Sequence, residues 1–185
     1  MLRSDQARCN RIPPDTEQRI GANMDIDFDS MTPIEGVYQF ISKAFSDERC
    51  LDIEENETGD SVPLICFPEH GGDNQKFRLR RNDEGYYAIQ AVHSDKVLDG
   101  SMTERSPRWR VIQFHPNVGP NQLWRFELVL GTDVEAPAVR IRTQYEDGYV
   151  LTPRQIDGRR NMDVFLEKEN NEFPNEQMFT IRRVD

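Results

Sequence analysis

The sequence has 185 residues, of which 36% are hydrophobic and 30% are charged, and its net charge is −10. This length fits one domain with an additional segment, and the composition predicts a compact core beneath a charged surface. The negative charge has the wrong sign for a nucleic-acid-binding protein, which needs a positive field to displace counterions from phosphate. No apolar run approaches a membrane span, and the N-terminus lacks the apolar core of a secretory signal. We therefore expect a soluble, cytoplasmic protein, unless it is exported by an unconventional route.

Residues 1–33 show no sustained helical or strand periodicity. They contain Pro13-Pro14 and an acidic stretch over residues 24–29. A segment of this kind buries little apolar surface, so we expect a mostly disordered, flexible N-terminal arm. The ordered domain is predicted to span residues 34–185.

A turn-forming cluster that leads into Gln-x-aromatic occurs three times in the predicted domain. The copies are Gly71–Phe77, Val118–Trp124 and Phe173–Phe179. An apolar residue follows each aromatic residue two positions later, which places both side chains on one face of a strand. Recurrence at this spacing predicts an internal repeat.

Three further short strands are expected upstream of each Gln-x-aromatic strand. The first strands of the three units are predicted at 36–40, 85–89 and 137–141, the second at 50–52, 97–99 and 150–152, and the third at 62–67, 109–114 and 162–166. Leu51 and Leu98 are 47 positions apart, as are Gln75 and Gln122, so the first two units are in phase. The repeats are predicted to cover about 36–81, 85–129 and 137–183, with turn signals throughout.

One such unit cannot bury its apolar face alone, but three units around an axis can close a small barrel without exposed strand edges. Three units are too few for a propeller. The sequence therefore predicts an all-β protein, a β-trefoil of three pseudo-repeats with four short strands each.

The triple pattern resembles the ricin B-type lectin family over about residues 34–185. The resemblance rests on Cys50-Leu51-Asp52 with Asn74–Phe77, and on the matching segments of the other two repeats. Loops such as His70–Gln75 are also similar to those of fungal β-trefoil proteins, which include lectins and protease inhibitors of the mycocypin type. The resemblance implies the trefoil fold and, more weakly, carbohydrate binding, because function depends on sites built onto a fold.

In this family, a sugar site is implied where a repeat keeps three groups. They are an Asp after the second strand, an aromatic group on the third strand, and an Asn before Gln-x-aromatic. The carboxylate accepts strong hydrogen bonds from sugar hydroxyls, the amide binds another hydroxyl, and the aromatic ring covers the apolar face of the sugar. The Gln and the following aromatic residue have mainly structural roles in this scheme.

The first two repeats keep the Asp and the Asn, but aliphatic Ile65 and Ile112 occupy the usual stacking positions. Phe67 or His70 would have to replace the aromatic group in the first repeat, and Trp109, Phe114 and His115 lie near the stacking position of the second. The candidate carbohydrate-binding residues are Asp52, Phe67, His70, Asn74 and Gln75 in the first repeat, and Asp99, Phe114, His115, Asn121 and Gln122 in the second. The third repeat has Thr152 and Glu176 instead, so its site should be lost.

These polar residues also have a purely structural interpretation. Asp and Asn at strand ends and turns often only cap local backbone N–H groups. The three histidines, His70, His93 and His115, are in no metal or catalytic motif, and no pattern predicts a cofactor, a metal site or an enzyme. Cys50 corresponds to Val97 and Val150 in the other repeats, so we expect Cys50 and Cys66 to be buried apolar residues, not a disulfide.

Two classes of function follow. The first is a lectin that binds glycans or glycoproteins, and a homodimer of such a lectin would gain avidity. The second is a protease inhibitor that inserts a stiff loop into a protease cleft. Its candidate loops are Ser101–Arg108 and Thr152–Arg160, which both contain Pro and Arg. A protein-interaction module that uses the trefoil surface is a third alternative.

Overall fold

The computed structural model describes residues 26–27, 32–33, 35–101, 109–117, 119–129, 138–159 and 161–185. The predicted N-terminal arm therefore lies outside the described residues, except for β1 (Ile26–Asp27) and β2 (Thr32–Pro33), which pair antiparallel. Within the described ranges, none of the helices has the length and apolar character that a membrane-spanning helix requires.

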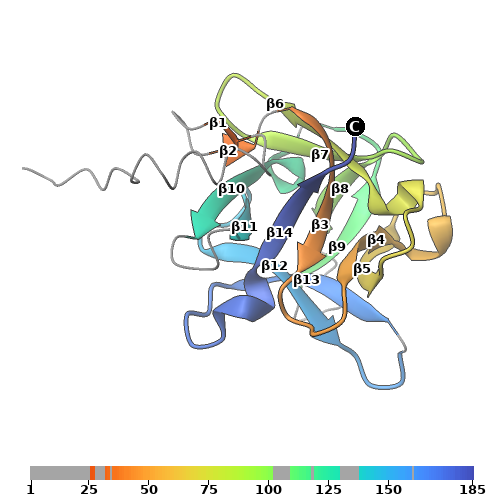
Figure 1. Ribbon diagram of the computed structural model, residues 1–185. Coiled ribbons are helices and arrows are strands. Elements are labelled where there is room, and N and C mark those ends of the chain that lie inside the picture. The colour runs from red at the N-terminus through yellow and green to blue at the C-terminus, as the bar shows by residue number, and fades with distance from the viewer. Residues whose placement is uncertain are drawn as a thin grey trace, which may run out of the picture.

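In the described part of the chain, twelve strands form one sheet and confirm the predicted β-trefoil of three four-stranded repeats (Figure 1). The first repeat contains β3 (Gly36–Ser42), β4 (Arg49–Ile53), β5 (Val62–Pro68) and β6 (Phe77–Arg81). The second contains β7 (Tyr87–Ala91), β8 (Val97–Ser101), β9 (Trp109–Phe114) and β10 (Trp124–Val129). The third contains β11 (Ala138–Thr143), β12 (Tyr149–Gln155), β13 (Met162–Lys168) and β14 (Phe179–Arg183).

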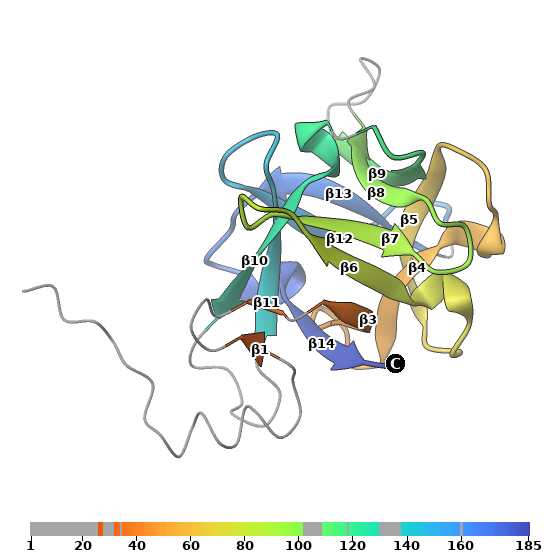
Figure 2. The same ribbon diagram turned by 90° about the horizontal axis from the view of Figure 1, so that it is seen from above.

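The first and fourth strands of the repeats form a closed barrel. The antiparallel pairs run β3–β6, β6–β7, β7–β10, β10–β11, β11–β14 and β14–β3, which returns to the starting strand. Figure 2 shows β14 and β3 at one side of this ring, so the end of the domain closes onto its beginning. Each barrel strand has a partner on both sides, which removes the exposed edges that an open sheet would present.

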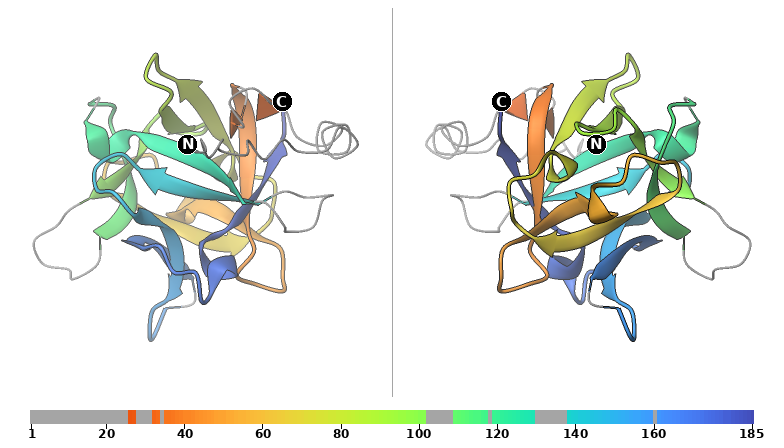
Figure 3. Two further views of the ribbon diagram at one scale, coloured as in Figure 1. Left: turned by 90° about the vertical axis from the view of Figure 1, so that its left-hand side faces the viewer. Right: turned by 90° about the vertical axis from the view of Figure 1, so that its right-hand side faces the viewer.

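The second and third strands of each repeat form a hairpin, and the three hairpins cap the barrel. The hairpins β4–β5, β8–β9 and β12–β13 are joined by the pairs β5–β9, β9–β13 and β13–β5. Figure 3 shows the β12–β13 hairpin at the end of the molecule opposite the C-terminus. Asp163 on β13 pairs with Ile65 on β5, so residues of the third repeat lie beside the first.

The core is built from the apolar residues that alternate along the barrel strands. Phe40 stacks on Phe126 at 5.9 Å between ring centroids, and it contacts Phe77 at 5.8 Å. Tyr87 meets Phe126 edge to face at 5.1 Å, and its hydroxyl donates to the carbonyl of Pro33 at 2.6 Å. These aromatic residues come from the first and fourth strands of the first two repeats, so the alternation read from the sequence defines the core.

Two local features differ from the sequence prediction. The strand expected at 85–89 begins at Tyr87, because Gly85 closes a turn before it. Gly85 has a φ of +84°, and its backbone N–H donates to the backbone carbonyl of Asn82 at 3.0 Å. The Gln of each Gln-x-aromatic motif ends a single 3₁₀ turn and precedes the strand. These turns are η2 (Asp73–Gln75), η3 (Pro120–Gln122) and η4 (Pro174–Gln177).

Cys50 and Cys66 are free and fully buried, as predicted. In the β4–β5 register, Cys66 lies opposite Leu51 and Cys50 lies opposite Phe67. Burial raises the pKa of the Cys50 thiol to about 12, and burial also raises the pKa of Cys66. Both side chains are therefore protonated at neutral pH and act as small apolar core residues.

Phe40→Ala should lower the free energy of unfolding by about 3–5 kcal/mol, because it removes a ring from the centre of the barrel and leaves a cavity. Phe173→Ala is the matched control. Its ring is 59% exposed, so this change should cost less than about 0.5 kcal/mol. Urea unfolding followed by tryptophan fluorescence measures both values, and equal effects of the two variants would contradict this description of the core.

Candidate functional site

Each repeat contains a buried glutamine that makes the same set of hydrogen bonds. The glutamines are Gln75, Gln122 and Gln177. Each Oε1 accepts a backbone N–H, from His70 at 2.9 Å, Asn117 at 2.8 Å and Asn170 at 2.7 Å. Each Nε2 donates to a backbone carbonyl at the end of the third strand, of Pro68, His115 and Lys168. The same Nε2 also donates to a side chain on the second strand, Asp52, Asp99 or Thr152.

The buried glutamine of each repeat is therefore an anchor, which fixes the loop after the third strand against the second strand. Gln75 has no exposed surface and Gln122 is 3% exposed. Both amide hydrogens and the oxygen of each side chain are already engaged within the protein. Gln75 and Gln122 therefore position the neighbouring carboxylates and have no free atom for a ligand.

Asp52 on β4 is the centre of the first-repeat site. Its Oδ1 accepts a hydrogen bond from Asn74 Nδ2 at 2.9 Å, and its Oδ2 accepts from Gln75 Nε2 at 2.8 Å. Asp52 is only 2% exposed, and burial raises the pKa of its carboxyl, although the hydrogen bonds from Gln75, His70 and Asn74 lower it in part. The sequence predicted the three residues Asp52, Asn74 and Gln75, and the structure brings them together.

His70 is the third partner of Asp52. Its Nδ1 accepts the backbone N–H of Gly72 at 3.2 Å, which leaves Nε2 to carry the proton of a neutral ring. Nε2 lies 3.1 Å from Asp52 Oδ2 and donates to it. The loop that Gln75 anchors thus fixes both the position and the tautomer of His70.

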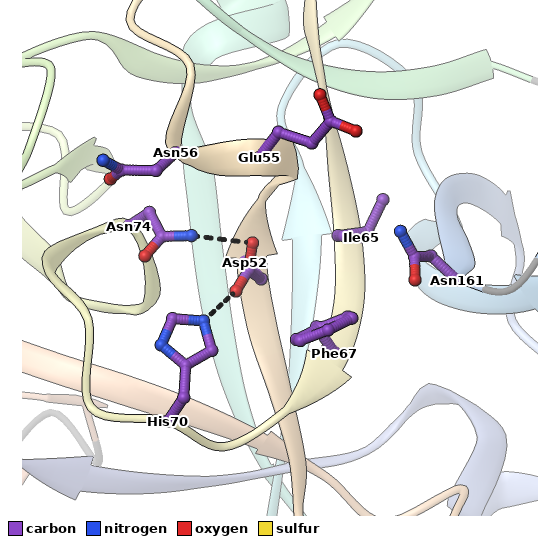
Figure 4. Close-up of a pocket in the computed structure, with 8 residues that line it drawn as sticks. All are labelled: Asp52, Glu55, Asn56, Ile65, Phe67, His70, Asn74 and Asn161. Atoms are coloured by element: carbon purple, nitrogen blue, oxygen red, sulfur yellow. Dashed lines mark hydrogen bonds and ion pairs between the residues drawn. The ribbon is translucent and has the colours of Figure 1, made fainter.

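These groups line a pocket of about 430 Å³ (Figure 4). Its lining residues are Asp52, Glu55, Asn56, Ile65, Phe67, His70, Asn74 and Asn161. Asn74 and His70 lie on one side of Asp52, and Phe67, Ile65 and Asn161 lie on the other. Asn161 belongs to the third repeat and reaches the pocket because β13 pairs with β5. The pocket therefore combines residues from two repeats.

Phe67 supplies the aromatic surface of the pocket. Ile65 is 2% exposed at the position where the family resemblance implies a stacking ring. Phe67 is two residues further along β5, on the same face of the strand. Its ring meets that of His70 at 5.9 Å between centroids and 70° between planes. The two rings form an apolar wall beside the polar groups.

The sequence did not reveal Glu55, Asn56 or Asn161 as pocket residues. Glu55 and Asn56 belong to η1 (Glu54–Asn56) and have positive φ angles of 56° and 55°. This left-handed conformation favours glycine and, to a lesser degree, asparagine, so residue 56 is compatible with it but Glu55 gives no signal for it. The place of Asn161 depends on pairing between strands of different repeats, which no local sequence pattern reveals.

The second repeat reproduces the polar pair but not its surroundings. Asp99 Oδ1 accepts from Asn121 Nδ2 at 2.8 Å, and Asp99 Oδ2 accepts from Gln122 Nε2 at 2.8 Å. Asp99 is 4% exposed and lies on β8, as predicted. The counterparts of Glu55 and Asn56 in the second repeat, residues 102 and 103, lie outside the described residues.

His115 does not take the place that His70 has in the first repeat. Its Nδ1 lies 3.0 Å from Asp60 Oδ2, and the hydrogen bonds from His115 and Lys96 lower the pKa of Asp60 to about 2. Phe114 packs against the ring of His115 at 4.2 Å. The counterpart of His70 is Asn117, which precedes Gln122 by five positions just as His70 precedes Gln75. Counting back from the glutamine would have identified it from the sequence.

The third repeat replaces the polar pair with an ion-pair network. The Thr152 hydroxyl, fully buried, accepts from Gln177 Nε2 at 3.0 Å. Glu176, at the position of Asn74, pairs with Arg154, which also pairs with Glu167 at 2.8 Å. Arg154 lies in the candidate inhibitory loop Thr152–Arg160, and these two carboxylates engage it. The other candidate loop, Ser101–Arg108, lies outside the described residues except for Ser101.

The model of the ricin-type beta-trefoil lectin domain-like family matches residues 27–114 and 73–164. The chain belongs to this family. The structural likeness agrees with the assignment, because β-trefoil lectins are among the most similar solved structures.

The chain is similar to flavastacin in sequence and to two solved β-trefoil proteins in structure. Flavastacin of Elizabethkingia meningoseptica is 31% identical over 70 residues, which are 37% of this chain and only 16% of flavastacin. The designed three-fold symmetric protein ThreeFoil has a TM-score of 0.67 and 26% identity, over 80% of this chain and 99% of ThreeFoil. The Macrolepiota procera ricin B-like lectin, solved in complex with lactose, has a TM-score of 0.59 and 16% identity. That match covers 83% of this chain and 100% of the lectin, and it shows the fold alone.

The carboxyl of Asp52 should titrate above 3.8, the ordinary aspartate value, because burial disfavours its charged form. A pKa that folding raises means that ionisation destabilises the folded state. The protonated carboxyl therefore contributes to the stability of the folded state. This contribution is complete below the ordinary pKa and is lost as the pH rises through the pKa of the folded state. His70→Ala should raise the pKa further, because it removes a hydrogen bond to the carboxylate. Carbon-detected NMR titration of the Asp52 carboxyl gives its pKa in the wild type and in His70→Ala. A wild-type pKa below the ordinary value would contradict the burial argument.

Proposed function

We propose that this protein is a non-catalytic carbohydrate-binding protein and that the first-repeat pocket is its main sugar site. The observation that carries the proposal is the convergence of Asp52, Asn74, Phe67 and His70 on one pocket. Its volume of about 430 Å³ lies within the range of small-molecule sites. The pocket thus combines hydrogen-bonding groups with an apolar wall, as a sugar ring requires.

The free hydrogen-bonding capacity of Asp52 and Asn74 consists of acceptors. Asp52 Oδ1 accepts one bond and Oδ2 accepts two, so Oδ1 retains a further lone pair. Asn74 Nδ2 donates to Asp52 and to the carbonyl of Ile53 at 3.1 Å. Both of its hydrogens are therefore used, while its Oδ1 has no partner among the described residues. Asp52 and Asn74 accordingly accept hydrogen bonds from two sugar hydroxyls.

Phe67 and His70 provide the surface for the C–H face of the sugar. The Phe67 ring is half-buried, so the pocket holds it in place while part of its face remains accessible. The aromatic residue of this strand is Phe67, whereas position 65 is an isoleucine, so the stacking surface lies two residues further along β5. The bound ring should therefore lie closer to His70 than it would over Ile65.

The three repeats should differ in affinity. Asp99 and Asn121 repeat the polar pair of the first site, but His115 is paired with Asp60 and does not face them. We propose a weaker second site at Asp99 and none in the third repeat, where Arg154 neutralises Glu176. The partners of the protein would then be glycans or glycoproteins that engage one or two sites.

A glycan array comparing wild type with Asp52→Asn and Asp99→Asn tests this proposal. Asp52→Asn should weaken binding at least about tenfold, because it replaces a charge-assisted acceptor, worth about 1.5–3 kcal/mol, by a neutral one. Asp99→Asn should have a smaller effect, and the double variant should bind no glycan. Thermal melts establish that each variant is folded.

Asp47→Asn is the matched control, because Asp47 is exposed and lies outside the pocket. It should leave the binding profile unchanged. A folded double variant with the same profile as wild type would overturn the assignment of the sites, and a wild-type protein that binds no saccharide would overturn the proposed function.

A further inference from the structure

We propose that the first-repeat pocket selects its saccharide by charge, and that it prefers a sugar with a free, protonated amino group, which pairs with Glu55. The inference rests on the proposed function, because it assigns the chemical class of the ligand to the same pocket.

The charged side chains that line the pocket are acidic. Asp52 and Glu55 are both lining residues, and the described lining residues include no Lys or Arg. The nearby Arg159 is engaged elsewhere, with Glu54 at 2.7 Å and with Asp163 at 3.0 Å. A pocket lined with negative charge favours cationic ligands and repels a carboxylate or a sulfate. Sugars with acidic substituents should therefore bind poorly.

Glu55 is the carboxylate in this pocket that remains available for a ligand. It is exposed and makes no hydrogen bond or ion pair within the described residues, whereas its neighbour Glu54 is paired with Arg159. Figure 4 shows its carboxylate at one rim of the pocket, on the side opposite His70 and Phe67. Asp52, in contrast, already accepts three hydrogen bonds from side chains around it.

This arrangement separates two recognition functions across the pocket. Asp52 and Asn74 accept sugar hydroxyls at the base, while Glu55 reaches a substituent at the rim. An ammonium group carries three donors and a positive charge, and the free acceptors of the pocket match it. N-acetylation removes the charge and leaves one N–H donor, so the acetylated sugar loses the ion pair.

The test compares matched methyl glycosides in two series, glucosamine with N-acetylglucosamine and glucuronic acid, and galactosamine with N-acetylgalactosamine and galacturonic acid. NMR titrations of the full chain at pH 6.5 give the dissociation constants. In the series that binds, the amino sugar should bind about two- to fivefold more tightly than the N-acetyl sugar, as expected for a solvent-exposed ion pair. The uronic acid should bind most weakly.

Glu55→Gln should abolish the preference for the amino sugar, so that this variant binds the amino sugar and the N-acetyl sugar with equal affinity. Glu57→Gln is the matched control, because it removes the same charge from an exposed residue that does not line the pocket. It should retain the preference.

The outcomes separate the two proposals. Equal affinity for the amino and N-acetyl sugars, with binding that still depends on Asp52, would overturn charge selection and leave the proposed function intact. A preference that survives Glu55→Gln would likewise overturn the role of Glu55. No binding in either series, together with no binding on the glycan array, would overturn both proposals.

Discussion

The structure depends on a buried glutamine that joins two segments of each repeat. The amide group of this side chain is buried, and a backbone N–H and a backbone carbonyl of the loop after the third strand supply its partners. Each such hydrogen bond contributes about 1 kcal/mol net, but an unsatisfied buried group costs about 1–3 kcal/mol. Gln75, Gln122 and Gln177 satisfy these groups in the same way in every repeat. The anchor thus sets the loop geometry on which any site in this fold must be built.

The same anchor explains how three similar loops acquire different chemistry. Its Nε2 always reaches the second strand, where it meets a carboxylate in two repeats and the hydroxyl of Thr152 in the third. The residue whose N–H it accepts is a histidine in the first repeat and an asparagine in the other two. The histidine of the first repeat, His70, adds a second ring beside Phe67. Sites therefore diverge by substitution around a constant hydrogen-bonded frame.

The sequence was sufficient to predict the fold and the polar centre of the first site. The period of two along each strand and the recurrence of the Gln-x-aromatic motif define strands and repeats, because both are local patterns in the chain. Asp52 and Asn74 could be found for the same reason, since each has a fixed position relative to a repeat motif. His115 was expected to contribute to the second site, but it precedes Gln122 by seven positions and pairs with Asp60, whereas His70 precedes Gln75 by five positions.

The remaining part of the pocket depends on tertiary structure. Glu55 and Asn56 reach it through a turn with two successive left-handed residues, and the preference of asparagine for this conformation does not extend to Glu55. Asn161 reaches it through the pairing of β13 with β5, which brings the third repeat to the first. The rim of the pocket, which distinguishes this site from a general trefoil site, therefore became visible only in three dimensions.

The most direct measurement is a ¹⁵N NMR titration of the wild-type protein with a saccharide that it binds on the array, followed through side-chain amide signals. Binding in the first-repeat pocket should shift the amide signals of Asn74 and Asn161, which line it from opposite sides. The signal of Gln177, which is buried in the third repeat, should stay in place. Saturable binding that leaves Asn74 and Asn161 unchanged, and shifts residues of the third repeat around Gln177, would contradict the location of the sugar site.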